Sequence, residues 1–198
     1  MNTEPAKRMR TIKTPEDRRQ DLLDAGLRVL REKGAGTTVA DVAKAAGVAK
    51  GTFYLYFASK DALVAELRHR LDETFLAGVT DGLELVEPAD WWRMADRTVE
   101  MFVDFLLDVQ DVHDVLYHRP AGTGSGGTTG VDMVAEFLRR GSEHGPFAVR
   151  DPETTAALLF SALHGAVDIA VARGRVDRDR VVDAARELVR RSLSAPSP

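Results

Sequence analysis

Residues 37–63 read TTVADVAKAAGVAKGTFYLYFASKDAL, and this stretch decides the fold of the first third of the chain. Thr38 followed by Asp41 is the pattern of a capping box, in which a hydroxyl and a carboxylate pair with backbone N–H groups at the start of a helix. That helix is predicted to end at Gly47, because glycine tolerates the positive φ of a tight turn. A second short helix is predicted over 49–55. Two short helices joined in this way form a helix-turn-helix.

The second short helix carries residues suited to a DNA major groove. Hydroxyl and ammonium groups reach phosphate oxygens or base edges, and a glycine lets the helix backbone approach the duplex. The residues expected to face DNA are Lys50, Gly51, Thr52, Tyr54 and Tyr56. Those expected to face inward and anchor the helix are Val48, Phe53 and Phe57.

This stretch resembles the DNA-binding domain of the TetR family of bacterial transcriptional repressors, with the pattern T-V-x-D-[IV]-A-x-x-A-G-V-x-x-G-x-[FL]-Y-x-[YH]-F-x-[SN]-K-x-x-L. The matching residues are Thr38, Val39, Asp41, Val42, Ala43, Ala46, Gly47, Val48, Gly51, Phe53, Tyr54, Tyr56, Phe57, Ser59, Lys60 and Leu63. The resemblance in sequence covers residues 15–65. Beyond that segment, only the number and length of the predicted helices agree with the family.

The resemblance implies a role for each matching residue on the DNA-binding side. Base or phosphate contacts are implied for Lys50, Gly51, Thr52 and Tyr56, and phosphate contacts for Tyr54 and Lys60. Thr38 is implied to cap its helix and to contact the DNA backbone. Ala49 departs from the pattern, because the family often has a serine there that caps the recognition helix. Losing such a cap costs about 1 kcal/mol of local helix stability.

The composition is that of a folded, water-soluble chain. It has 198 residues, 44% hydrophobic and 29% charged, with a net charge of -4. A chain of this length buries about 70% of its unfolded surface, so disorder as the main state is excluded. Without cysteine there is no disulfide, no thiolate nucleophile and no cysteine-bound zinc, which predicts a cytoplasmic location. The apolar run 154–167 is shorter than the roughly 20 residues of a membrane span, and no secretory signal is recognised, so no membrane partner is expected.

Charge is distributed unevenly along the chain. Residues 1–60 carry a net charge of +5 and residues 61–198 a net charge of -9. This asymmetry has two explanations. Either the first third of the chain faces a polyanion, or the charged residues are distributed by chance over solvent-exposed helix faces. The basic arm over 6–13 likewise either reaches a neighbouring DNA groove or is a solvated tail.

The signals for helix starts and ends predict about nine helices. No stretch of useful length alternates apolar and polar residues as a β-strand does, so an all-α fold is predicted. It combines an N-terminal three-helix DNA-binding domain with a C-terminal helical ligand-binding and dimerisation domain. The predicted parts are a flexible basic arm over 1–13, the helix-turn-helix domain over 14–60, the helical domain over 61–193 and a frayed tail over 194–198. A long helix is expected to begin at Pro88, and the glycine-rich stretch 121–130 is expected to be a mobile loop.

TetR-like proteins, by family resemblance, bind a small molecule in the C-terminal domain. The candidates for a small hydrophobic ligand are Trp91, Met94, Phe102, Phe105, Leu106, His113, Leu116, Tyr117, Met133, Phe137, Phe160 and His164. A mostly apolar wall with few polar groups suits such a pocket, but the core of a helical domain that binds no ligand has the same composition. His164 is either a hydrogen-bonded core or interface histidine or a ligand contact. The 121–130 loop either gates the pocket or is a tolerated insertion.

The last two helices, expected near 152–173 and 178–193, are too apolar for one to cover the other. In the family such a pair meets its twofold mate, and an isologous interface agrees with this composition. The sequence therefore predicts a homodimer. Two recognition helices in such a dimer call for double-stranded DNA with an inverted-repeat operator. Release of that DNA by the ligand is implied by the resemblance.

Two other classes of protein are alternatives to this interpretation. A di-iron helical bundle or enzyme needs two Glu-x-x-His motifs, whereas the chain has one, from Glu66 to His69. Neither a phosphate-binding loop nor a nucleophile–base arrangement is visible, so no catalytic residue, metal or cofactor is expected. The other alternative is a DNA-binding protein without a ligand. The helices expected over 88–174 argue against it, because a protein that reads only DNA would not need them.

Overall fold

A computed structural model describes residues 13–84, 87, 89–117, 130–174 and 176–195. These residues form nine α-helices and one short 3-10 helix, and none of them lies in a β-strand. The prediction of an all-α fold is therefore confirmed. The chain divides into two compact units, residues 1–67 and 68–198, called here the N-terminal and C-terminal units.

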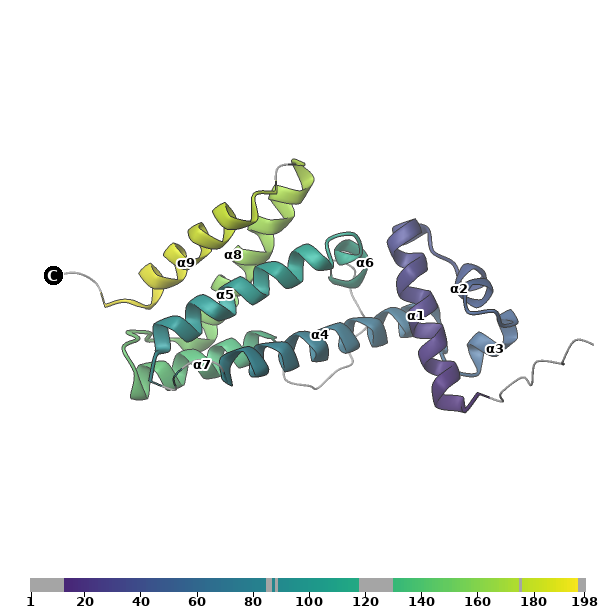
Figure 1. Ribbon diagram of the computed structural model, residues 1–198, viewed down its shortest axis with the longest axis horizontal. Coiled ribbons are helices and arrows are strands. Elements are labelled where there is room, and N and C mark those ends of the chain that lie inside the picture. The colour runs from purple at the N-terminus through teal and green to yellow at the C-terminus, as the bar shows by residue number, and fades with distance from the viewer. Residues whose placement is uncertain (1–12, 85–86, 88, 118–129, 175, 196–198) are drawn as a thin grey trace, which may run out of the picture. The chain divides into compact units, whose positions relative to one another are not determined.

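Short helices of the N-terminal unit pack around one longer helix (Figure 1). The elements are α1 (Pro15–Lys33), the 3-10 helix Gly34–Gly36, α2 (Val39–Ala45), α3 (Lys50–Tyr54) and the start of α4 (Lys60–Glu84). Helix α1 begins at Pro15, because Thr14 accepts a hydrogen bond from the backbone of Asp17 and Asp17 accepts one from the backbone of Thr14. Ser59 caps α4, with its hydroxyl accepting from the backbone N–H of Ala62 at 3.1 Å.

Large apolar side chains fill the centre of the N-terminal unit. The fully buried ones are Leu22, Leu23, Leu30, Val42, Phe53, Leu63 and Leu67. Helix α4 approaches α1 closely at Gly26, where a Cβ would lie 2.8 Å from Leu63 Cδ2. The first turns of α4 therefore belong to this unit, which extends to Leu67.

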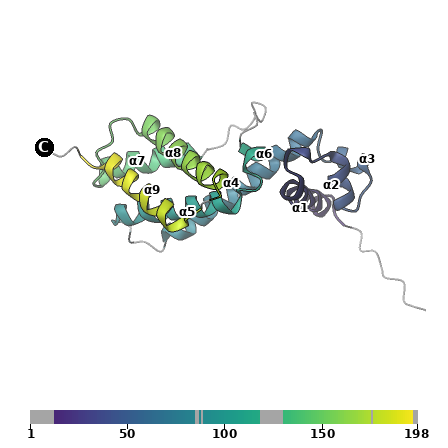
Figure 2. The same cartoon turned by 90° about the horizontal axis from the view of Figure 1, so that it is seen from above.

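Five complete helices and the rest of α4 form the C-terminal unit. The five are α5 (Trp91–Asp108), α6 (His113–Tyr117), α7 (Gly130–His144), α8 (Pro152–Ala172) and α9 (Arg178–Leu193). Helix α8 packs against α5, α7 and α9, and α5 runs beside α9 (Figures 1 and 2). Aspartates cap α8 and α9, since Asp151 accepts from the N–H of Thr154 and Asp177 from that of Arg180.

The start of α5 differs from the sequence prediction. The helix begins at Trp91 rather than at Pro88, because the Asp90 carboxylate accepts the backbone N–H of Arg93 at 3.0 Å. An aspartate cap of this kind satisfies a donor that the first helical turn leaves without a partner. Pro88 itself, the arm residues 1–12 and most of the 121–130 loop lie outside the described residues.

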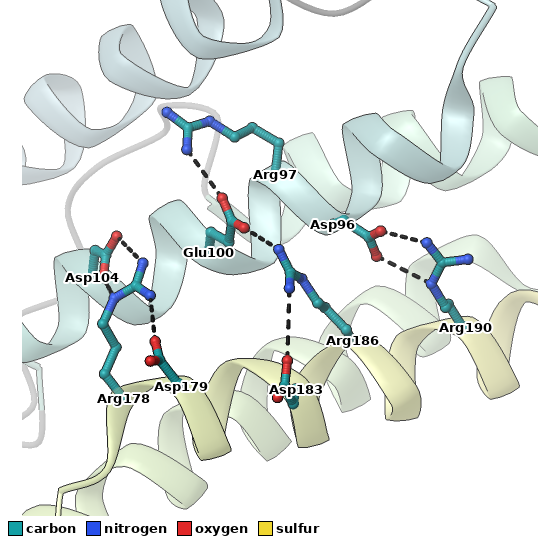
Figure 3. Close-up of polar contacts among 9 residues, drawn as sticks. All are labelled: Asp96, Arg97, Glu100, Asp104, Arg178, Asp179, Asp183, Arg186 and Arg190. Carbon is teal, nitrogen blue, oxygen red and sulfur yellow. Dashed lines mark hydrogen bonds and ion pairs between the residues drawn. The ribbon is translucent and has the colours of Figure 1, made fainter.

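A row of ion pairs joins α5 to α9 (Figure 3). The pairs are Asp96–Arg190, Glu100–Arg186 and Asp104–Arg178. The numbers rise along α5 as they fall along α9, so the two helices are antiparallel. The Arg178 guanidinium donates to Asp104 and holds the pKa of that carboxyl below its ordinary value. This α5–α9 ion-pair row ties a helix of the core to the last helix of the chain.

Helix α8 has an unusual exposed surface for a central helix. Leu158 is 66% exposed and Ile169 is 53% exposed. By length and composition α8 is able to cross a membrane, and 22% of its most apolar window is buried within the chain. From the sequence no membrane span is expected, because the charge-free run 154–167 is too short. The window within α8 is longer because it admits charged residues. A single helix of this kind is weak evidence for a membrane protein.

Candidate nucleic-acid interface and ligand cavity

The turn between α2 and α3 has the geometry of a helix-turn-helix. Gly47 has a φ of 67°, in the left-handed region that favours glycine. The N–H of Gly47 donates to Lys44 O at 3.1 Å, and that of Val48 donates to Ala43 O at 3.0 Å. These bonds end α2 and turn the chain directly into α3.

The start of α2 is held by a polar cluster around Asp41. Its carboxylate accepts the Thr38 hydroxyl at 2.7 Å and the Thr38 backbone N–H at 3.0 Å, while Lys33 donates to it at 2.5 Å. The hydrogen bonds from Lys33 and Thr38 lower the pKa of Asp41 to about 2. Thr38 caps the helix as the sequence predicts, and its side chain is exposed at the protein surface. Its contact with DNA stays a prediction.

Two phenylalanines anchor α3 in the N-terminal unit. Phe53 is completely buried and Phe57 is 4% exposed, with their ring centroids 5.6 Å apart. Val48, the third expected anchor, is half-buried. Ala49 stands at the N-cap position and offers no side-chain hydrogen bond, as its residue type requires.

The residues expected to face DNA lie at or near the surface. Lys50, Gly51 and Tyr54 are exposed, and Thr52 and Tyr56 are half-buried. Tyr54 is 50% exposed, while its ring edge packs on Phe53 with centroids 5.5 Å apart. A buried Phe53 therefore fixes the orientation of a short helix whose remaining residues present an ammonium, hydroxyls and bare backbone.

Lys60 has a structural role that the sequence did not reveal. Its ammonium donates to Thr37 O at 3.0 Å and to Ala35 O at 3.3 Å, linking the start of α4 to the segment before α2. A phosphate contact would have to share this ammonium with the two carbonyls. In the arm, Lys13 donates to Asp21 at 2.6 Å, and the preceding twelve residues lie outside the described part of the chain.

A cavity of about 860 Å³ lies within the C-terminal unit, which is in the range of small-molecule sites. Six of the ligand candidates line it, namely Trp91, Met94, Phe102, Met133, Phe137 and Phe160. Helix α4 also lines the cavity with residues outside the predicted set, namely Phe75, Leu76, Val79 and Thr80. Phe75 belongs to the apolar series of that helix, but sequence spacing does not say which cavity such a series faces.

The other six candidates do not line this cavity. Phe105 packs against Phe75 with ring centroids 4.7 Å apart, and Leu106 and Leu116 are buried at 2% and 1% exposure. The remaining three, His113, Tyr117 and His164, form a ring cluster beside the cavity wall.

This ring cluster connects three helices of the C-terminal unit. His164 of α8 packs on the cavity residue Phe160 at 4.4 Å between centroids, and on His113 of α6 at 5.4 Å. The Tyr117 hydroxyl donates to Asp72 of α4 at 2.7 Å. Burial raises the pKa of Asp72, and burial together with the Asp72 charge raises the pKa of Tyr117. His164 is half-buried beside the cavity, and its Nδ1 lies 3.1 Å from Phe160 O.

The single Glu-x-x-His motif is divided between different partners. Arg19 donates to Glu66 at 2.8 Å, and His69 Nδ1 lies 3.2 Å from a Glu73 carboxylate oxygen. Within the described ranges, no group of three histidine, aspartate or glutamate side chains could hold a metal ion.

A second hollow, about 850 Å³, lies between α8 and α9 on the outer side of the unit. Small residues of both helices line it, including Ala162, Ala166 and Ala184. Ile169 and Leu188, which also line it, are 53% and 41% exposed. Exposed apolar side chains gathered on one face are typical of an interaction site.

Comparison with known proteins places the N-terminal segment in one family. Residues 22–67 match the family model "Bacterial regulatory proteins, tetR family". The chain is 39% identical over 87 residues to the uncharacterised HTH-type transcriptional regulator YvdT of Bacillus subtilis, covering 41% of each chain. It is 45% identical over 60 residues to the HTH-type transcriptional repressor KstR2 of Rhodococcus jostii, covering 29% of each. The chain thus spans less than half the length of these curated relatives.

The whole fold also has a counterpart among solved structures. The transcriptional regulator FadR of Bacillus subtilis, solved with stearoyl-CoA, has a TM-score of 0.72 and 19% identity, covering 88% of this chain and 98% of that one. At this identity the likeness concerns the fold alone. The helix-turn-helix built around Gly47 and the match over 22–67 agree: the N-terminal segment is similar to the bacterial regulatory proteins of the tetR family, and the all-helical fold is shared with FadR.

Proposed function

We propose that this protein is a DNA-binding transcriptional repressor that binds an inverted-repeat operator as a homodimer and is released by a small hydrophobic ligand. One observation carries the DNA-binding part: α3 is pinned by buried Phe53 while Lys50, Gly51 and Tyr54 are exposed around it. A short, firmly seated helix with donors on its outer side suits the major groove. The relative KstR2 is a transcriptional repressor, which supports repression.

The homodimer rests on the outer face of α8 and α9. Leu158, Ile169 and Leu188 are exposed on these helices, although a soluble chain gains free energy by covering such side chains. A second copy would cover them with the same face, which gives an isologous interface with a twofold axis. The same pairing accounts for a helix as apolar as α8 in a protein that acts in the cytoplasm.

The ligand site is the 860 Å³ cavity between α4, α5, α7, α8 and α9. Most of its wall is apolar, and five aromatic side chains contribute to it, namely Phe75, Trp91, Phe102, Phe137 and Phe160. A ligand that binds the DNA-free form of the protein more tightly than the DNA-bound form shifts the equilibrium between the two toward the DNA-free form. The size of the shift is set by the ratio of the two affinities. The regulator FadR, solved with stearoyl-CoA, shares this fold and supports a ligand-responsive role.

The experiment that tests DNA binding is in vitro selection of a random duplex library, followed by fluorescence anisotropy with the recovered duplex. We expect an inverted repeat, and we expect Lys50→Ala to weaken binding and to reduce its salt dependence by about one unit of slope. Recovery of no common sequence, or unchanged salt dependence in the variant, would contradict the proposal.

The dimer is tested by sedimentation of Ile169→Glu, which places a charge in the outer face of α8. Ala77→Glu is the matched control, because Ala77 is an exposed apolar residue on a different helix. We expect the wild type and the control to sediment as dimers at micromolar concentration and Ile169→Glu as a monomer with weaker operator binding. A wild-type monomer would refute the homodimer.

A ligand-independent DNA-binding protein is the second candidate function. The large aromatic cavity argues against it, because such a void gives up packing contacts that a purely structural core would keep. A thermal-shift screen of hydrophobic compounds separates the two candidates. A specific ligand stabilises the fold and weakens operator binding, whereas a structural core responds to none.

A further inference from the structure

Leu55 is the most exposed large apolar side chain in the described part of the chain, with 80% of its surface open to solvent. It directly follows α3 and is not among the residues that the sequence predicts to face DNA. The other exposed aliphatic side chains, such as Leu158 and Ile169, belong to the C-terminal unit. The dimer face proposed above therefore does not account for the exposure of Leu55.

Leu55 continues the helical backbone of α3. Its φ of -74° and ψ of -21° are helical, and its N–H donates to Thr52 O at 3.2 Å. Successive helical residues turn by about 100°, so Gly51 and Leu55, two positions before and two after Phe53, both lie on the side opposite that ring. Phe53 is completely buried, so the side of α3 that carries Gly51 and Leu55 faces away from the core. An exposed leucine alone is ordinary on a protein surface, but this one lies on the outermost side of α3.

The outward side of α3 combines open space with a projecting apolar group. A Cβ on Gly51 would meet no protein atom within 4 Å, so the Leu55 side chain does not fill the space in front of that glycine. Lys50 and Tyr54, on either side, are exposed and have polar ends that form hydrogen bonds. The side chain of Leu55 forms none, so a base that it contacts has to offer an apolar group.

The base edges in the major groove of DNA offer one such group. It is the 5-methyl group of thymine, whereas the other exposed positions are hydrogen-bond donors and acceptors. A leucine pressed against a donor or acceptor removes its water and gives no hydrogen bond in return, which costs free energy. Contact with a methyl group instead removes apolar surface from water on both sides. The chemistry of Leu55 therefore selects thymine among the bases.

We infer that Leu55 reads a T·A base pair in each half of the operator by packing on the 5-methyl group of the thymine, beside the point where the α3 backbone approaches the duplex at Gly51. This inference deepens the proposed function and rests on it. It adds a base-reading residue to the DNA surface and assigns a chemical feature to the operator.

The test compares forms of the selected duplex that differ only in methyl groups. Each thymine is replaced in turn, together with its symmetry mate, by deoxyuridine, which keeps the hydrogen-bonding edge of thymine and lacks the 5-methyl group. Burial of one methyl group is worth about fourfold in affinity, so losing it from both half-sites should weaken wild-type binding about fifteenfold at one symmetric pair. Thymines elsewhere in the same duplex are the internal control.

Variants of Leu55 show whether this residue is the source of the methyl effect. At the sensitive pair, Leu55→Ala should bind the thymine and deoxyuridine duplexes about equally, and Leu55→Met, which keeps a long apolar side chain, should preserve most of the difference. Lys50→Ala is the matched control on the same helix, because it should weaken binding to both duplexes and leave their ratio unchanged. Since Leu55 is exposed, Leu55→Ala should also leave the urea unfolding midpoint unchanged.

Two results would overturn the assignment of thymine. One is a selected duplex in which no deoxyuridine pair weakens wild-type binding by more than about twofold, below the effect of one buried methyl group. The other is a methyl effect of the same size in Leu55→Ala, which would assign that effect to a different residue. In both cases the protein still binds a selected duplex, so the proposed function stands. Recovery of no common duplex refutes the proposed function and, with it, any base contact of Leu55.

Discussion

Replacing Gly51 with alanine should make the protein more stable and a weaker DNA binder. Gly51 is the second residue of α3 and is exposed, and a methyl group there would meet no protein atom within 4 Å. Its φ is not positive, unlike those of Gly34, Gly47 and Gly174. Alanine in place of glycine in an unobstructed helix gains about 0.5–1 kcal/mol.

The same methyl group would occupy the space through which the α3 backbone is proposed to approach the duplex. Loss of one good contact to a base costs about 1–3 kcal/mol, which corresponds to about 5- to 150-fold in operator affinity. Urea unfolding and fluorescence anisotropy with the selected duplex measure the two effects separately. Because stability and affinity are expected to move in opposite directions, loss of folded protein cannot explain the weaker binding.

Two other glycines serve as controls for this prediction. Gly47→Ala forces a side chain into the left-handed region, where φ is 67°, and should destabilise the N-terminal unit by about 1–2 kcal/mol. Gly36→Ala adds a methyl group in open space away from α3 and should leave operator affinity unchanged. Unchanged affinity in Gly51→Ala would refute the placement of α3 against DNA, and lower stability would refute the argument from open space.

Three further variants test the polar contacts. Asp41→Asn should be less stable than the wild type at neutral pH. The pKa of Asp41 is lowered from its ordinary value of 3.8 to about 2. The extra stability of the wild type is therefore fully present above pH 3.8 and is lost as the pH falls toward 2, which urea unfolding midpoints measured over this pH range would show. Tyr117→Phe should cost about 1 kcal/mol, since half-buried Asp72 loses a donor, and NMR titration should show a further rise in the pKa of Asp72. Asp104→Ala should cost less than about 1 kcal/mol and less still in high salt, because its pair with α9 is exposed; a loss above 2 kcal/mol would contradict this ranking.

The starts of several helices are predictable from the sequence because the hydrogen bonds that cap them join residues close together in the chain. Thr14, Thr38, Asp151 and Asp177 each cap a helix within three residues, so the sequence pattern contains both partners of each bond. The start of α5 was predicted three residues early because Pro88 is also a common first helical residue. There the Asp90 side chain decides the boundary.

The ligand site was less predictable than the candidate DNA surface. The residues that face outward from α3 lie within seven positions of one another, and buried Phe53 determines their orientation. The cavity instead combines residues of five helices, from Phe75 to Leu193. Apolar spacing identified Trp91 and Phe137 as members of apolar faces, but it could not show that Leu106 packs into the core while Phe102 borders a void.

By itself the sequence determined an all-helical chain with a helix-turn-helix around Gly47, because capping bonds, glycine conformation and helical periodicity act between residues a few positions apart. Tertiary structure alone decided the extent of the cavity, the α5–α9 ion-pair row and the ties of Lys60 to the carbonyls of Ala35 and Thr37. Those features depend on which side chains meet after distant segments pack, and close packing of irregular shapes leaves a void or an ion pair only where the assembled surfaces permit it.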